Sequence, residues 1–288
     1  MKFKNILIVY NPFSQGGKSV YFFNEYLTII RKEGSPFTIF ETTGINDIKT
    51  IQKNIASNSF DLISIIGGDG TINITINGLQ DFSIPLHIIP AGTGNDLARM
   101  LYGNLEISDI LKLPFQFTKK VDIDIWSCNQ IRFINGFGAG FDGAIAEKTQ
   151  SKTFLLSSKT KYWIEIVKQI LFYRSQKVEI NGKKTAIFMI AAANGSDYGG
   201  GFKVAPLAKL NDKKLEYVEC KNIPTLLRLY YLPLVQAGKH LNQKAITYKK
   251  IDELTISSNQ PLPAHLDGEA LCEKNYHIKW QNQVQILR

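Results

Sequence analysis

The sequence predicts a two-part protein: a doubly wound α/β nucleotide-binding domain followed by an all-β domain. The chain has 288 residues, which suits one large domain or two ordinary ones. Up to about residue 120, short apolar runs alternate with helical patterns, as in a parallel sheet covered by helices. Beyond it, short alternating runs are separated by turn residues, which favours an antiparallel sandwich or barrel.

The stretch around residues 62–78 is the centre of the first part. An apolar run at 62–66 predicts a buried strand and leads directly into Gly67-Gly68-Asp69-Gly70-Thr71, after which 71–78 predicts a helix. Glycine lets the backbone approach a ligand closely, and a helix N-terminus attracts phosphate. A plain tight turn needs only one or two glycines, so the pattern favours a phosphate-binding turn.

Other elements of the first part follow in order. Strands are predicted at 6–10, 37–40 and 85–89, and helices at 18–34, 47–56 and 97–101. The loop after the first strand ends in Gly17-Lys18-Ser19 but has Pro12 where a P-loop needs its first glycine, so it is not a P-loop. Ligands of such sheets bind at the carboxyl ends of the strands, where this loop, Thr42 and the Gly67 turn all fall.

A second glycine-rich turn follows the strand at 85–89. It reads Pro90-Ala91-Gly92-Thr93-Gly94-Asn95-Asp96, and either Asn95 or Asp96 is expected to cap the next helix. An ordinary capped loop explains it as well. Because two polar, glycine-rich turns lie at one sheet edge, we expect them to share a ligand.

The second half carries the remaining motifs. Strands are predicted at 121–126, 131–137, 177–180, 185–192, 214–219 and 246–256, and helices at 159–172 and 225–240. The run Gly138–Gly143 matches G-x-G-x-x-G, but no βαβ unit surrounds it, so a dinucleotide site there is a weak alternative. Asp267-Gly268-Glu269 sets two carboxylates around a glycine, which suits either a hairpin turn or a catalytic pair.

Charge and cysteine content limit the class of protein. The net charge of +9 favours an anionic partner such as a nucleotide or an anionic membrane, but the lysines are scattered rather than grouped into a nucleic-acid-binding arm. The three cysteines show neither metal-ligand spacing nor a disulfide framework, which fits a reducing cytosol. With no apolar stretch near the ~20 residues of a membrane span, we expect a cytoplasmic protein that is soluble or peripherally membrane-associated.

Three motifs in one order resemble the soluble diacylglycerol kinase family, which includes bacterial lipid kinases and the sphingosine and ceramide kinases. They are the Gly67 turn, the Gly92 turn and Asp267-Gly268-Glu269. The first alone is shared with NAD kinases and phosphofructokinases, whereas the ordered set is specific. The opening Asn11-Pro12 and the stretch 135–142 are also similar to that family, so the resemblance covers nearly the whole chain.

The resemblance implies a fold and a set of site residues. It implies an α/β ATP-binding domain over 1–120 with a C-terminal return at 282–288, and a β-sandwich domain over 121–281. Glu269 matches the proton acceptor, Asp267 a nearby implicated carboxylate, and Asp96 an electrostatic partner. The implied ATP contacts are Asn11, Thr42 (or Thr43 in its place), Gly67, Gly68, Asp69, Gly70, Thr71, Asn73, Gly92, Thr93 and Asn95.

A structural magnesium is also implied by the resemblance. Asp212 falls on its aspartate ligand, with the carbonyls of Lys209 and Lys214 beside it. The family usually has Asp-Gly at this point and this chain has Asp-Lys, which puts the ion in doubt.

We therefore expect a lipid kinase that uses ATP and Mg²⁺ at an anionic membrane, forms a homodimer and binds no nucleic acid. Diacylglycerol is the default acceptor, although sphingoid bases, ceramide, undecaprenol and phosphatidylglycerol also offer a hydroxyl. Three alternatives stay open: a kinase of NAD or another soluble alcohol, a non-catalytic nucleotide- or lipid-binding regulator, and a dinucleotide oxidoreductase.

Overall fold

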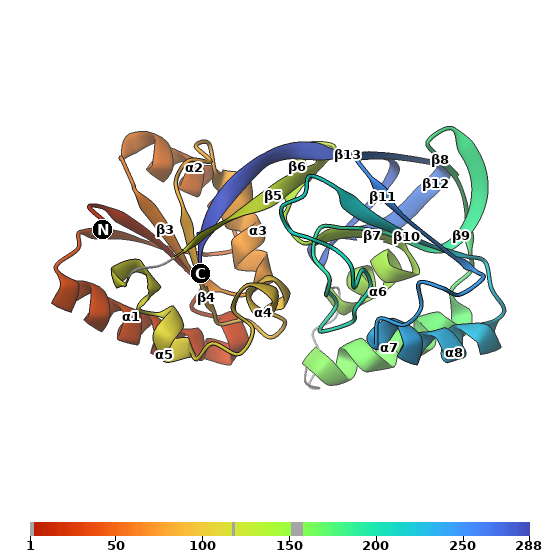
Figure 1. Cartoon of the computed structure of the whole chain (residues 1–288), viewed down its shortest axis with the longest axis horizontal. Coiled ribbons are helices and arrows are strands. Elements are labelled where there is room, and N and C mark those ends of the chain that lie inside the picture. Colours follow the sequence, from red (N-terminus) through yellow and green to blue (C-terminus); the bar gives the residue numbers. More distant parts are fainter. Residues whose placement is uncertain (1–2, 117–118, 151–157) are drawn as a thin grey trace. The chain divides into compact units, whose positions relative to one another are not determined.

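The chain divides into two compact units in the computed structural model, which describes residues 3–116, 119–150 and 158–288 (Figure 1). The first unit is Met1–Ile125 together with Asn282–Arg288, and the second is Trp126–Gln281. The first unit therefore runs slightly past the boundary expected near residue 120.

The first unit is built on a parallel sheet with the order β13-β4-β3-β1-β2. Every strand predicted here is present within a residue or so of its expected bounds. Because β1 lies between β3 and β2, the winding direction reverses between β1 and β3, which is where sheets of this class bind ligands. The strands are β1 (Ile6–Tyr10), β2 (Phe37–Glu41), β3 (Leu62–Gly67) and β4 (Leu86–Pro90), with the end of β13 (Glu269–Leu287).

The helices of this unit begin and end close to the residues that the sequence predicts. The first, α1 (Ser19–Glu33), ends because Gly34 adopts the left-handed conformation, with φ of 64°. Tyr26 of α1 is fully buried and shares a 2.6 Å hydroxyl hydrogen bond with Ser64 of β3. The others are α2 (Asp47–Ser57), α3 (Asp69–Gly78), α4 (Asp96–Tyr102) and α5 (Ile107–Ile110), with 3-10 turns at Ser14–Gly17 and Leu113–Phe115.

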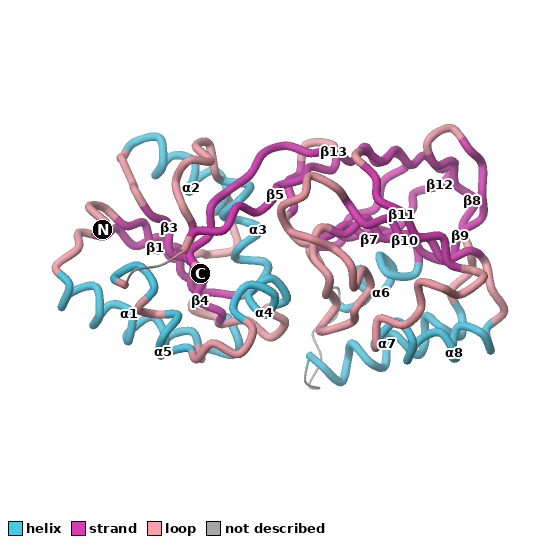
Figure 2. The backbone as a smooth tube through the Cα atoms, in the orientation of Figure 1, coloured by secondary structure: helices cyan, strands magenta, loops and turns pink. Residues whose placement is uncertain are grey.

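The second unit is antiparallel in all of its described strand pairings (Figure 2). Its strands are β5 (Lys120–Cys128, which starts in the first unit), β6 (Ile131–Phe133), β7 (Gly136–Gly140), β8 (Gln176–Ile180), β9 (Lys183–Ala193), β10 (Leu215–Lys221), β11 (Ile246–Ile251), β12 (Glu253–Leu266) and β13. Its helices are α6 (Phe141–Gln150), α7 (Ser158–Phe172) and α8 (Thr225–Gln236).

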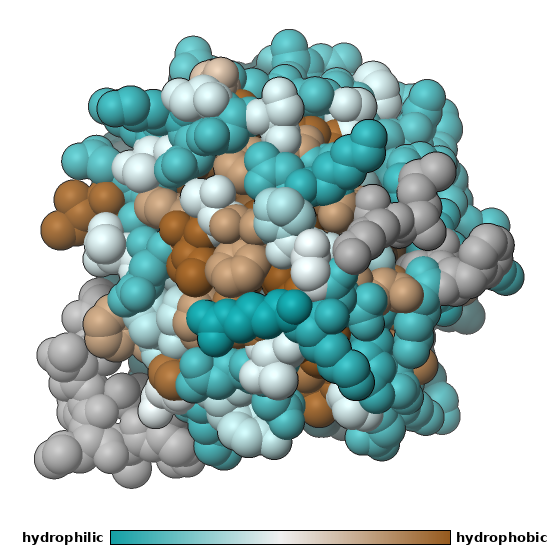
Figure 3. Space-filling model, turned by 90° about the vertical axis from the view of Figure 1, so that its left-hand side faces the viewer, coloured by the Kyte–Doolittle hydropathy of each residue, from teal (hydrophilic) through white to brown (hydrophobic). Residues whose placement is uncertain are grey.

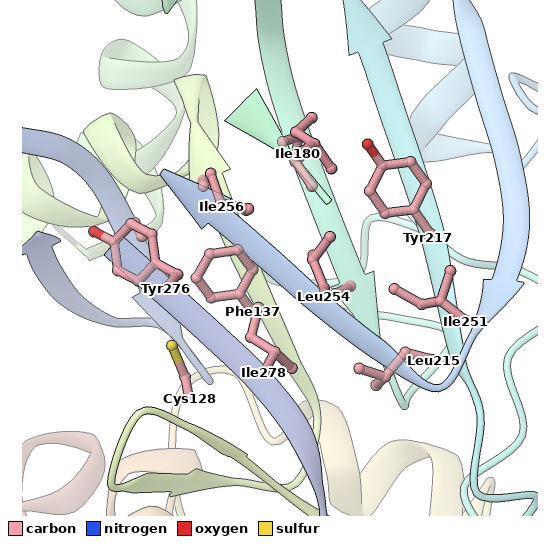
Figure 4. Close-up of a cluster of buried hydrophobic side chains, with 14 of the residues drawn as sticks. Cys128, Phe137, Ile180, Leu215, Tyr217, Ile251, Leu254, Ile256, Tyr276 and Ile278 are labelled. Atoms are coloured by element: carbon pink, nitrogen blue, oxygen red, sulfur yellow. The ribbon is translucent and has the colours of Figure 1, made fainter. Parts of the chain in front are cut away.

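Alternating strand residues build the core of this unit. Figure 4 shows Phe137, Ile256 and Tyr276 side by side, from β7, β12 and β13, and the rings of Phe137 and Tyr276 lie 5.3 Å apart. All three side chains are buried. The predicted all-β second domain is therefore a packed β-sandwich with its own apolar core.

Four elements of the second half differ from their predictions. The run 131–137 is two strands, β6 and β7, and the run 246–256 is likewise divided between β11 and β12. Helix α6 was not predicted, because its first residues were considered only as part of a weak G-x-G-x-x-G match. Strand β13 was expected only at its C-terminal end, because its middle is polar and largely exposed and so lacks a hydrophobic pattern.

The first unit exposes an edge of its sheet. Among the described strands β2 pairs only with β1, and its Ile39 is 43% exposed. Figure 3, which views the molecule from the left-hand side of Figure 1, shows apolar residues gathered in the middle of a largely polar face. A free edge of this kind can pair with another chain. The homodimer itself stays a prediction.

No helix in the described ranges is long and apolar enough to span a membrane.

Candidate active site

The two glycine-rich turns of the first unit touch each other. A Cβ on Gly68 would lie 2.9 Å from the Cα of Gly92, and one on Gly92 would lie 2.4 Å from the Cα of Gly68. Any side chain at either position would therefore force the turns apart. The amide of Ala91 also donates to the carbonyl of Gly67, at 2.8 Å. The two turns, which were expected to share a ligand, thus lie against each other, and their glycines put no side chain at this contact beside the start of α3.

The loop after β1 borders the same place. The side-chain amide of Asn11 (Nδ2) donates to Thr71 Oγ1 at 3.4 Å, and Ser14 Oγ donates to the Ala91 carbonyl at 2.7 Å. A Cβ on Gly67 would lie 2.2 Å from Thr71 Oγ1, so the threonine hydroxyl fills the space that this glycine leaves. Ser14 had no predicted role, because a serine in a loop carries no spacing signal.

The remaining predicted ATP contacts lie on the same turns or near them. Gly70 is in the first helical turn of α3, and Asn73 is buried one helical turn further on. Thr93 is exposed in the glycine-rich turn that follows β4. Asn95 does not cap α4 through its side chain as expected. Its Oδ1 instead accepts the Gly92 amide at 2.8 Å, which holds the second turn closed.

The choice between Thr42 and Thr43 follows from their contacts. Thr43 donates its hydroxyl to Asp47 at 3.0 Å, so it belongs to the start of α2. Thr42 is buried, and its amide donates to the carbonyl of Tyr10 at the carboxyl edge of the sheet. The position of Thr42 therefore fits the role expected for it better than that of Thr43.

Two carboxylates flank Gly94 in the first unit. A Cβ placed there would lie 2.9 Å from Asp69 Oδ2 and 4.0 Å from Asp96 Oδ2. The other oxygen of Asp96 forms an ion pair with Arg99, one turn further along α4. Oxygen ligands of this kind suit Mg²⁺, which usually binds one or two carboxylates together with phosphates.

Asp267 and Gly268 form a two-residue hairpin turn between β12 and β13. Both have positive φ, of 52° and 91°, as a tight hairpin turn requires. The Asp267 carboxylate accepts three backbone N–H groups, from Ile134 at 2.9 Å, Asn135 at 2.8 Å and Gly136 at 2.9 Å. Three such donors stabilise the ionised carboxylate and occupy most of its lone pairs. Asp267 therefore fastens the turn to the start of β7.

Glu269 is the first residue of β13, directly after that turn. It is exposed, and it lies opposite Leu266 in the hairpin. The two carboxylates that the sequence left as alternatives thus differ in their surroundings. Asp267 is turned inward onto the backbone, whereas Glu269 presents its side chain at the surface of the unit.

The glycines of 138–143 are explained by packing. A Cβ on Gly138 would lie 2.3 Å from His265 Nε2, and one on Gly143 would lie 2.3 Å from the backbone of Ala264. Both glycines therefore let β7 and α6 approach β12. This removes the basis for a dinucleotide site at this motif.

An apolar cavity of about 80 Å³ lies within the second unit, between its sheet and α6, α7 and α8. Aromatic and aliphatic side chains line most of it, including Phe141, Ile145, Ile166, Ile170, Phe188 and Tyr231. Asp142 also lines it, and its carboxylate bonds to His265, two residues before Asp267. The cavity thus has a polar end next to the hairpin turn. Sequence reasoning missed it, because its lining comes from six separate elements.

The residues at Asp212 do not fit the divalent cation that the resemblance implies. Asp212 Oδ2 accepts Lys250 Nζ at 2.6 Å, and its Oδ1 accepts the Lys214 amide at 3.2 Å. The same ammonium lies 3.5 Å from Glu216, which is 2% exposed and stands opposite Lys250 across β10 and β11. A lysine ammonium thus holds the position at which a divalent cation would neutralise these carboxylates.

We expect Lys250→Met to lower the melting temperature by a few degrees, because Asp212 and Glu216 lose their counter-charge. In the variant, millimolar Mg²⁺ should recover part of the loss, whereas the wild type should melt at the same temperature with Mg²⁺ or with a chelator. Lys249→Met is the control, since Lys249 lies over the Tyr217 ring instead. Wild-type protein that a chelator destabilises would contradict this account.

Comparisons with known proteins agree across the whole chain. The diacylglycerol kinase catalytic domain model matches residues 5–124, and the YegS C-terminal NAD kinase beta sandwich-like domain model matches residues 136–285. A diacylglycerol kinase of Bacillus subtilis (strain 168) is 31% identical over 280 residues, which cover 92% of this chain and 90% of that protein. One from Staphylococcus carnosus (strain TM300) is 26% identical and covers 92% and 89%.

The fold is also similar to a solved structure. The crystal structure of a diacylglycerol kinase from Bacillus anthracis str. Sterne superposes with a TM-score of 0.71 at 22% identity, covering 100% of this chain and 97% of that one. This supports the α/β and β-sandwich architecture. By its two family models and its relatives, the chain belongs to the diacylglycerol kinase catalytic domain family and is a lipid kinase of that family, an ATP-dependent phosphotransferase.

Proposed function

We propose that this chain transfers the γ-phosphoryl group of ATP to the hydroxyl of diacylglycerol, giving phosphatidic acid and ADP. The apolar cavity of the second unit carries this proposal. It is lined largely by aromatic and aliphatic side chains, with Asp142 at its polar end. An acyl chain is the part of a lipid acceptor that such a lining suits, whereas NAD or another soluble alcohol has no group for it. The relatives named diacylglycerol kinases favour this acceptor among lipids.

The residues of the first unit bind and orient ATP. The N-terminus of α3 and the bare backbone of Gly67, Gly68 and Gly92 receive the phosphates, with Asn11 and Thr71 beside them. Asp69 and Asp96 would hold the Mg²⁺ that accompanies ATP. When bound, that ion neutralises charge on the phosphates.

Glu269 takes the proton from the acceptor hydroxyl. A general base must be able to reach the acceptor, and Glu269 is exposed, whereas the Asp267 carboxylate binds three backbone N–H groups of its own unit. As the oxygen of the lipid hydroxyl bonds to the γ-phosphorus, its proton passes to Glu269 and the bond to ADP breaks. Asp267 fixes the turn from which Glu269 projects.

Filling the cavity tests the acyl-chain assignment. We expect Ile166→Trp to raise KM for long-chain diacylglycerol about tenfold or more, because Ile166 lines the cavity and is 2% exposed. A short-chain acceptor should be affected much less, and ATP binding should not change. Ile131→Trp is the matched control, since Ile131 lies on β6 of the same unit, is 46% exposed and lines neither the cavity nor the helices α7 and α8. Equal KM values for the two variants would contradict the assignment.

The enzyme docks on an anionic membrane through α7 and α8, which pack side by side. Both helices expose large apolar side chains: Trp163, Ile164, Val167, Leu171 and Phe172 on α7, and Leu226, Leu227, Leu229 and Tyr230 on α8. Membrane binding uses such side chains together with attraction between a cationic protein and anionic lipid. The chain carries a net charge of +9.

We expect Phe172→Glu with Leu226→Glu to abolish flotation with anionic liposomes and leave the melting temperature unchanged, because these side chains are 78% and 81% exposed. Ile45→Glu, at a residue 74% exposed in the first unit, is the control. Wild-type binding should weaken with added salt. Equal flotation of the wild type with neutral and anionic lipids at low salt would contradict the proposed attraction between the cationic protein and anionic lipid.

Other acceptors are outcomes of the same assays. Transfer to a sphingoid base, ceramide, undecaprenol or phosphatidylglycerol would keep the lipid kinase and change its substrate. Transfer to NAD or another soluble alcohol, and to no lipid, would contradict the proposal that the cavity binds an acyl chain. Binding of ATP with no transfer would indicate a regulator.

A further inference from the structure

His265 is buried beneath the hairpin turn that carries Glu269. It lies on β12, 4% exposed, directly opposite Gly138 of β7. Its Nε2 is 3.0 Å from Asp142 Oδ2, and its Nδ1 is 3.3 Å from the backbone nitrogen of Gly268. One ring therefore connects the start of α6 with the residue next to Glu269.

The two contacts determine where the ring carries its proton. A backbone N–H can only donate, so Nδ1 must accept the Gly268 amide through its lone pair. The proton of the neutral ring then lies on Nε2 and is donated to the Asp142 carboxylate. Gly138 makes this pair possible, because a Cβ there would lie 2.3 Å from Nε2 and 2.4 Å from Asp142 Oδ2.

We propose that His265 and Asp142 are positioning residues for phosphoryl transfer: Asp142 orients the His265 ring, and the unprotonated Nδ1 of His265 holds the Gly268 amide and thereby aims Glu269. The inference rests on the role proposed for Glu269. Asp267 holds one side of the turn through its carboxylate, and His265 holds the other through Gly268. A proton acceptor displaced by about 1 Å loses a large part of its rate enhancement. The hydrogen bond between Gly268 and His265 therefore changes kcat rather than the affinity for lipid.

The surroundings of His265 make its hydrogen bond with the Gly268 amide sensitive to pH. Burial alone lowers the pKa of His265, but Asp142, by charge and hydrogen bond, and Asp267, by charge, raise it above its ordinary value. The loop before β10 presents the Tyr198 ring, whose centroid lies 5.5 Å from that of the His265 ring, and β7 presents Gly138. When the ring is doubly protonated, Nδ1 carries a hydrogen and no longer accepts the Gly268 amide. Turnover therefore falls as the pH drops through this pKa.

Folding stability runs in the opposite direction. The folded-state pKa of His265 lies above its unfolded value, so the ion pair with Asp142 contributes stability below the unfolded pKa and loses it as the pH rises through the folded pKa. At higher pH this group thus gives more turnover and less stability. A residue that only supports the fold would change both in the same direction.

Two substitutions test the roles of the two ring nitrogens of His265 separately. His265→Gln keeps a donor near the position of Nε2 and loses the acceptor for Gly268, whereas His265→Asn keeps an acceptor near Nδ1 and does not titrate. The measurement is kcat and KM for diacylglycerol in mixed micelles as a function of pH, with melting temperatures alongside. His277→Asn is the control, because His277 pairs with Glu253 on the exposed surface.

We expect His265→Gln to lower kcat by about tenfold to a hundredfold with an unchanged lipid KM. His265→Asn should keep more of the kcat and lose the acid limb of the profile. Asp142→Asn should move that limb to lower pH, because it removes a carboxylate that raises the pKa. His265→Gln with wild-type kcat, or an acid limb unmoved in Asp142→Asn, would overturn the inference while leaving the lipid kinase intact. A wild type that transfers phosphate to no lipid would overturn the proposed function and this inference with it.

Discussion

Replacing Glu269 with glutamine is expected to lower kcat by about a hundredfold to ten-thousandfold, the usual contribution of a general base. The amide keeps the size and place of the side chain at the start of β13 but cannot take a proton from the acceptor hydroxyl. Because Glu269 is exposed and follows the turn, the melting temperature and ATP affinity should stay at wild-type values. Steady-state transfer to diacylglycerol, thermal unfolding and nucleotide titration measure the three quantities.

Glu273→Gln is the matched control, since Glu273 is an exposed carboxylate four residues further along β13. It should keep wild-type kcat. Loss of activity in both variants would point to the charge of the strand and not to one base. A Glu269→Gln enzyme of full activity would contradict the assignment outright.

Asp267→Asn is expected to destabilise the second unit by roughly 2–3 kcal/mol, because one amide oxygen cannot accept the three N–H groups that the carboxylate holds. The NH₂ group of the asparagine would also face at least one of these donors. This corresponds to a melting temperature lower by roughly 5–10 °C. Activity should fall too, since the turn that carries Glu269 loosens.

The pattern across the two variants separates their roles. Glu269→Gln should lose activity and keep stability, whereas Asp267→Asn should lose both. If Asp267→Asn is as stable as the wild type and inactive while Glu269→Gln stays active, then Asp267 is the proton acceptor. Thermal unfolding and kcat measured on the same preparations decide between the two.

The first unit was predictable from sequence because its signals are local. The apolar run at residues 6–10, the helix stopped by Gly34 and the glycines after β3 each mark an element without help from the rest of the chain. The sequence also placed the two glycine-rich turns at one sheet edge, because parallel strands bring the turns at their carboxyl ends together, but it did not predict that Gly68 and Gly92 touch. Asn95 was wrong as a side-chain cap, since its oxygen has a nearer donor in the Gly92 amide.

The second unit was harder, because its contacts join residues that are distant in sequence. Nothing near His265 indicates that it meets Asp142, more than a hundred residues earlier, or that Gly138 leaves room for the pair. The ion pairs of Lys250 with Asp212 and Glu216 depend on the register of β10 and β11, which the sequence does not reveal. The one local signal that put the implied magnesium in doubt was Asp212-Lys213, where the family usually has Asp-Gly.

The most direct test of the account is transfer of the γ-phosphate of labelled ATP to a lipid panel in mixed micelles with Mg²⁺, for the wild type and for Glu269→Gln. The panel contains diacylglycerol, a sphingoid base, ceramide, undecaprenol and phosphatidylglycerol. We predict labelled phosphatidic acid with the wild type and almost none with the variant. No labelled lipid of any kind from a wild type that still binds ATP would contradict the central claim.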